Sequence, residues 1–144
     1  MTDPAPTATN PDGTATIHVD QFLPTPPAAV WRALTEPELL ARWWVAGDIR
    51  PVVGHCFTLD MGGWGPVPCE VLEVDPERRL SFTFTPAWTL TWRLEPEGTG
   101  TRLFLDHAGL DLDDPMGRHA FDTMGPGWRD EVLPRLVPVV AGLA

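Results

Sequence analysis

One histidine of the sequence stands where an interior side chain could do chemistry. His107 continues the alternation of Leu103 and Leu105, and alternate residues of a strand share a face, so we expect it to point inward. A neutral imidazole there could donate a hydrogen bond to a ligand carbonyl or act as a general base. The alternative, which we favour, is a core histidine hydrogen-bonded to the backbone. His107 is the only residue that we consider as a catalytic candidate.

Large aromatic side chains are unusually frequent. The chain has seven tryptophans in 144 residues, more than core filling alone requires. Ligand pockets are typically apolar with a few polar groups, so part of this set is expected to line a cavity; plain core packing is the alternative for most of its members. One tryptophan lies in a glycine-rich turn, where it could close over the cavity mouth. The candidate ligand contacts are Trp64, Phe82, Phe84, Trp88, Leu90, Trp92, Leu105, His107, Phe121, Met124 and Trp128.

Several other chemistries lack the residues that they need. The chain has no lysine, which excludes Schiff-base and P-loop mechanisms. Ser81 is its only serine and has no nucleophile-elbow context. No histidine pair has helical zinc spacing and no C-x-x-C motif occurs, so neither a metal nor a cofactor is predicted. Cys56 and Cys69 lie on a predicted hairpin a few positions out of register, so we expect two reduced, partly buried thiols.

Charge and length narrow the class of protein. A formal net charge of −10 argues against nucleic acid and anionic membranes as partners, because both attract basic proteins. No apolar run approaches the roughly 20 residues of a membrane helix, and the N-terminus lacks signal-peptide features, so a cytoplasmic location is expected. We predict a disordered tail at 1–13 and a single domain at 14–144.

An antiparallel meander forms the centre of the predicted fold. From 82 to 105, large apolar residues alternate with Thr or Arg, which gives one apolar and one polar face. Turns rich in Pro and Gly separate the strands. Further strands are expected at 14–23, 56–61 and 67–75, with a short edge strand at 48–51.

Helices are predicted before and after the meander in the sequence. Thr25 is expected to cap a first short helix, and a second begins at Thr35. After a helix at 116–124, the sequence Gly-Pro-Gly at 125–127 predicts a break. A final helix at 128–143 has an apolar stripe with its prolines on the opposite side, so we expect it to be kinked.

This order of elements resembles the START-like (SRPBCC) superfamily of helix-grip domains. The stretches 30–44 and 98–109, and Gly127-Trp128 with the leucines after it, resemble the branch named after the activator of the Hsp90 ATPase. The resemblance implies an α+β fold with a curved antiparallel sheet of about six or seven strands. It also implies two short helices after the first strand, and a long C-terminal helix that packs across the sheet, often over a cavity.

The resemblance suggests function only in outline. It implies that the cavity binds a hydrophobic, aromatic or polyketide-like small molecule. The alternatives are an aromatase/cyclase-type enzyme in which His107 moves a proton, and a self-resistance protein, because 116–128 resembles proteins that protect producers from their own enediyne antibiotics. A co-chaperone module for an Hsp90-type ATPase is a further alternative. The sequence leaves open whether the chain is a monomer or a homodimer.

Overall fold

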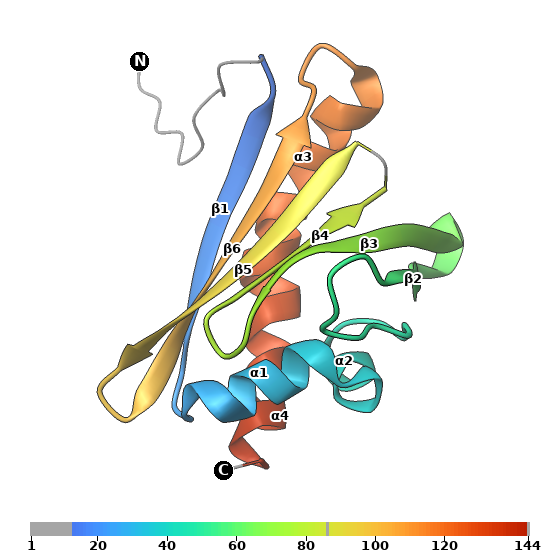
Figure 1. Ribbon diagram of the computed structural model, residues 1–144. Coiled ribbons are helices and arrows are strands. Elements are labelled where there is room, and N and C mark those ends of the chain that lie inside the picture. Colours follow the sequence, from blue (N-terminus) through green and yellow to red (C-terminus); the bar gives the residue numbers. More distant parts are fainter. Residues whose placement is uncertain (1–12, 86, 144) are drawn as a thin grey trace, which may run out of the picture.

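The computed structural model describes residues 13–85 and 87–143. The tail predicted at 1–13 lies outside the described residues except for Gly13. The described chain forms one six-stranded antiparallel sheet with a long helical segment across one face (Figure 1). This architecture confirms the predicted helix-grip fold.

The sheet has the order β1-β6-β5-β4-β3-β2, so the first and last strands lie side by side. Hydrophobic alternation determines which face each side chain occupies. In β5, Leu90, Trp92 and Leu94 are buried, while Thr91 and Arg93 between them are partly exposed. The strands are β1 (Ala15–Leu23), β2 (Cys56–Asp60), β3 (Pro66–Asp75), β4 (Arg79–Phe84), β5 (Trp88–Glu97) and β6 (Gly100–Leu110).

Two short helices, α1 (Pro27–Thr35) and α2 (Pro37–Trp43), follow β1 and pack against the C-terminal end of the chain (Figure 1). Each begins with a proline, which a first turn tolerates because its N–H would have no partner there. The prediction that Thr25 caps α1 is wrong. The N-cap is Pro26, and the Thr25 carbonyl instead accepts a hydrogen bond from Thr101 Oγ1 at 2.7 Å, which joins the helix entrance to β6.

The C-terminal helix is continuous through the predicted break. α3 (Pro115–Gly127) leads into a π-helical turn, η2 (Trp128–Val132), and then into α4 (Leu133–Ala141). Pro126 cannot donate a backbone hydrogen bond, but the Trp128 N–H bonds the carbonyls of Met124 and Gly125 and keeps the next turn helical. The break predicted at 125–127 is therefore wrong.

The π turn also accommodates the next proline. The Leu133 N–H bonds to the Trp128 carbonyl five residues earlier, so η2 holds one extra residue. Pro134 consequently falls in the first turn of α4, where no N–H is needed. Pro134 and Pro138 are both exposed, as the apolar stripe predicts.

Two smaller expectations need correction at the β2–β3 hairpin. Residues 48–51 form no strand, and the nearby pairing is a single bridge between Gly47 and Leu59. Cys69 pairs with Phe57, so it is offset from Cys56 by one position rather than by several. Neighbouring positions face opposite sides of a sheet, and both thiols are free, Cys69 buried and Cys56 exposed.

A bulge in β6 provides a test of this packing. The register with β1 passes from Leu110 to Ala108, so Gly109 is the extra residue, with φ of +93°. A Cβ there would lie 2.5 Å from the Ala87 carbonyl oxygen. We expect Gly109→Ala to lower the free energy of unfolding by about 3 kcal/mol, from backbone strain and the collision together.

Gly98→Ala is the matched control. Its φ is +61° and nothing lies within 4 Å of an added Cβ, so only the strain, about 1 kcal/mol, should appear. Chemical denaturation measures both losses. Equal losses would contradict the close approach of β6 to the β4–β5 turn.

Candidate ligand-binding cavity

A cavity of about 710 Å³ opens between α3 and the adjoining end of the sheet. That volume is in the range of pockets that hold drug-sized ligands. Its sides come from the β4–β5 turn, the end of β6, the loop into α3 and the 3₁₀ turn η1 (Gly62–Trp64). It is lined by Met61, Trp64, Val67, Phe84, Thr85, Ala87, Trp88, Gly109, Asp111, Asp114, Met116, Gly117, His119, Ala120, Thr123 and Met124.

Residue size along the C-terminal helix explains why the hollow lies at this end. The buried residues of α3 are Gly117 and Ala120, which leave space above the sheet. Directly after α3, the large side chains of Trp128 and then Leu133 are buried instead. The cavity therefore ends where the large side chains begin.

The loop before α3 supplies a polar rim. The Asp114 carboxylate accepts a hydrogen bond from the Gly117 N–H at 3.0 Å and so caps the helix. The Asp111 carboxylate accepts one from the Asp113 N–H at 2.9 Å. Both acids line the cavity, so its entrance has a negative potential.

Trp64 stands at the mouth. Its side chain belongs to η1 and is 71% exposed, the largest exposed fraction among the large hydrophobic residues that the structure describes. Gly62, two residues before it, and Gly65, directly after it, have φ of +64° and +75°, which permits the tight turn. The mouth thus presents an aromatic surface to solvent beside the hollow.

Stacked aromatic rings form the inner wall. Phe84 and Trp88 have ring centroids 6.1 Å apart with an interplanar angle of 28°. The His107 ring lies next to both, 5.1 Å from Trp88 and 6.1 Å from Phe84. His107 itself does not line the cavity, whereas the two rings beside it do.

His107 is fully buried and uncharged at neutral pH. Its Nδ1 accepts a hydrogen bond from the Trp128 indole Nε1 at 3.2 Å. Burial lowers the pKa of the imidazole from 6.5 to about 4. The expected backbone partner is wrong; the partner is a side chain of the C-terminal helix, which sequence spacing could not identify.

A tryptophan cluster fills the interior below the cavity. Trp128 packs against Trp44 at 5.0 Å and against Trp92 at 5.7 Å between ring centroids. Trp43 contacts Trp92 edge-on at 5.8 Å, and its indole N–H donates to the Ala33 carbonyl at 2.9 Å. This cluster joins the chain after α2 to the sheet and the C-terminal helix.

The candidate ligand contacts fall into two groups. Trp64, Phe84, Trp88 and Met124 line the cavity. Phe121 is partly buried against the core, and the remaining candidates, Phe82, Leu90, Trp92, Leu105, His107 and Trp128, are core residues beneath it. Contact with a ligand stays a prediction for all of them.

Sequence reasoning named Met124 but missed the other α3 residues that line the cavity and the loop before the helix. The signal was present: the run Asp-Leu-Asp-Asp-Pro at 111–115 is a helix cap, and Gly117 and Ala120 are small residues three apart on the inward face.

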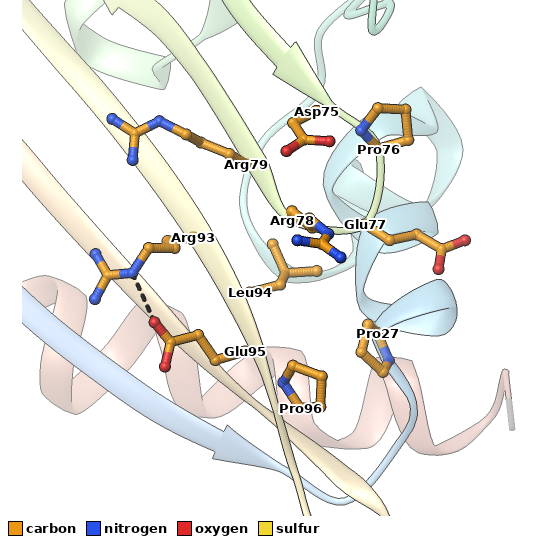
Figure 2. A pocket seen from close by; sticks show the side chains of 10 residues that line it. All are labelled: Pro27, Asp75, Pro76, Glu77, Arg78, Arg79, Arg93, Leu94, Glu95 and Pro96. Atoms are coloured by element: carbon orange, nitrogen blue, oxygen red, sulfur yellow. Dashed lines mark hydrogen bonds and ion pairs between the residues drawn. The ribbon is translucent and has the colours of Figure 1, made fainter.

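A second hollow, of about 560 Å³, lies at the opposite end of the sheet, between the β3–β4 turn, β5 and the start of α1 (Figure 2). Charged groups of both signs surround it. Arg93 pairs with Glu95 at 3.0 Å and Arg79 with Glu73 at 2.8 Å, and these side chains are about half exposed. Its lining lacks the aromatic wall of the α3 cavity.

Within the described ranges, no three His, Cys, Asp or Glu side chains gather closely enough to hold a metal ion. The same residues contain no helix with the length and apolarity required to cross a membrane.

A model of a known protein family matches most of the chain. The family model described as Activator of Hsp90 ATPase homolog 1-like protein matches residues 24–138. The chain belongs to this family. The branch expected from the sequence is therefore confirmed, whereas no curated protein matches the chain.

Several solved structures are similar to this family member over most of its length. Protein MLL2253 from Mesorhizobium loti is 32% identical, with 90% of this chain and 98% of that chain covered and a TM-score of 0.78. CalU16 from Micromonospora echinospora is 28% identical, with 94% and 82% covered and a TM-score of 0.72. DynU16, a putative protein in the dynemicin biosynthetic locus, is 24% identical with 88% and 47% covered and a TM-score of 0.74, and shows the fold alone.

Burial of His107 predicts a pH dependence of stability. Above pH 6.5 the imidazole is neutral in both states. Between 6.5 and about 4 it takes up a proton only when the chain unfolds, so stability falls as the pH falls. One pKa unit is worth about 1.4 kcal/mol, so going from about pH 7.5 to about pH 4.5 should cost roughly 2.5 kcal/mol through this group.

His107→Leu removes the titrating group. We expect its urea-unfolding free energy to fall less than that of wild type between those two pH values, by roughly that amount. The exposed carboxylates titrate alike in both proteins and cancel in the difference. An identical pH dependence in the two proteins would mean that His107 is not held neutral.

Proposed function

We propose that the protein binds a hydrophobic, aromatic or polyketide-like small molecule in the cavity between the sheet and α3. The supporting observation is the cavity itself, about 710 Å³ in volume with the stacked rings of Phe84 and Trp88 as its wall. Stacking on such rings contributes about 0.5–1.5 kcal/mol per aromatic pair beyond the burial of area. A flat, apolar ligand makes the most of this surface.

The charge of the protein restricts the ligand further. The net charge is −10, and the carboxylates of Asp111 and Asp114 lie on the cavity lining. A negative potential at the entrance lowers the local concentration of anions. The preferred ligand is therefore neutral or cationic.

Self-resistance to a natural product is the second candidate. The stretch 116–128, which resembles proteins that protect producers of enediyne antibiotics, contains much of α3, and five of its residues besides Gly117 line the cavity: Met116, His119, Ala120, Thr123 and Met124. In that role the same cavity would sequester a toxic ligand. Both candidates therefore depend on binding at one site.

Binding is better supported than proton-transfer catalysis. A general base works best when its pKa is near the working pH, and burial lowers the pKa of His107 to about 4. Its Nδ1 is also occupied by Trp128. An aromatase-like role for His107 would require ligand binding to raise this pKa and to release Nδ1 from Trp128.

A cavity-blocking variant tests the site. Chrysophanol, a neutral aromatic polyketide, should quench tryptophan emission saturably in the wild-type protein, because Trp64 and Trp88 line the cavity. Thr123→Phe places a ring in the same space, so we expect affinity to fall at least about tenfold, or about 1.4 kcal/mol. Fluorescence titration measures both.

Asp122→Phe is the matched control, since Asp122 is the neighbouring exposed residue of α3 and does not line the cavity. It should bind chrysophanol with wild-type affinity. Absence of saturable quenching in wild type by chrysophanol and a panel of neutral polyphenols would contradict the proposal.

A charged analogue tests the entrance potential. Rhein has the chrysophanol ring system with a carboxylate in place of the methyl group. We expect rhein to bind more weakly than chrysophanol at low ionic strength, and the gap to narrow as added salt screens Asp111 and Asp114. Equal affinities that salt does not change would refute the electrostatic preference.

A further inference from the structure

His107 carries a hydrogen-bond donor that lacks an acceptor. The Trp128 indole N–H can only donate, so the His107 Nδ1 that it bonds holds no proton. Burial keeps the ring neutral at pH 7, because it lowers the pKa to about 4. The single ring proton must therefore be on Nε2, and Nε2 is buried with no partner among the described residues.

A second buried donor lies in the same aromatic layer. The Trp92 Nε1–H is also without a partner in the described chain. Trp92 and His107 are on adjacent strands, since Leu90 pairs with His107 and Trp92 with Leu105, and both rings contact Trp128. A buried donor left unpaired costs about 1–3 kcal/mol, so two of them together favour an acceptor supplied from outside the chain.

Of the two cavity-lining rings next to His107, that of Trp88 is the more exposed. Trp88 is half-buried, lies 5.1 Å from His107 between ring centroids, and lines the cavity. It begins β5 directly after the β4–β5 turn, in which Thr85 has φ of +68°. A rotation of the Trp88 ring would join the His107 donor to the open volume, whereas Phe84 is fixed in the core.

We propose that His107 Nε2–H is the polar anchor of the cavity and selects ligands that carry an acceptor oxygen, such as a ketone or quinone, on a flat aromatic frame. This rests on the proposed function and narrows its ligand class. With the Trp88 ring rotated aside, the ring of the ligand lies against Phe84, and its oxygen accepts the hydrogen bond from the donor that the protein leaves unpaired. A purely hydrocarbon ligand of the same shape leaves the donor unsatisfied.

A matched ligand pair tests the anchor. 9-Fluorenone and fluorene have the same tricyclic frame and differ in one carbonyl group. A net hydrogen bond of about 0.5–1.5 kcal/mol predicts that wild type binds fluorenone roughly two- to tenfold more tightly than fluorene. In His107→Phe, which keeps a ring but has no donor, the ratio should fall to about one. In the control His18→Gln, on the outer sheet face, it should stay at the wild-type value.

Nitrogen NMR keeps the test decisive if His107→Phe fails to fold. In the free wild-type protein, the imidazole should show an Nε2–H tautomer at neutral pH. Fluorenone should shift the Nε2 resonance, and fluorene should leave it in place. Equal affinities with an unmoved Nε2 resonance would overturn the anchor while preserving the cavity as a binding site. Failure of both ligands to bind would overturn the proposed function and the anchor together.

Discussion

The packing of Trp128 is the interaction on which the rest of the structure depends. Its ring touches Trp44 after α2 and Trp92 in β5, and its indole N–H holds His107 in β6. One side chain of the C-terminal helix therefore contacts both the chain after α2 and the sheet, which are distant from it in sequence. The π turn that begins at Trp128 allows this contact, because its extra residue moves Pro134 into the first turn of α4. The helix can then continue across the sheet without a break.

The same residue divides the interior into a solid part and a hollow part. Toward α4, side chains such as Leu133 and Leu136 fill the space above the sheet. Toward α3, Gly117 and Ala120 leave this space open, and the loop before α3 lies only at its rim. The cavity therefore results from a change in residue size along one helix.

The sequence predicted the sheet well because alternation of apolar residues depends only on local geometry. It could not predict where along the helix the cavity lies, since that depends on which α3 side chain faces each strand residue. Trp88 and Trp92 have the same alternation, yet one lines the cavity and the other is core. The expected break at 125–127 failed for a related reason: the packing of Trp128 outweighs the poor helix propensity of Gly-Pro-Gly.

The central claim is that the hollow beside α3 is the place where a ligand binds. The indole N–H resonances of the wild-type protein test it directly when chrysophanol is added. We predict that Trp64 and Trp88, which line the cavity, shift saturably, while Trp31, in α1 at the other end of the domain, does not. Unchanged resonances for Trp64 and Trp88, or a saturable shift confined to Trp31, would contradict the account.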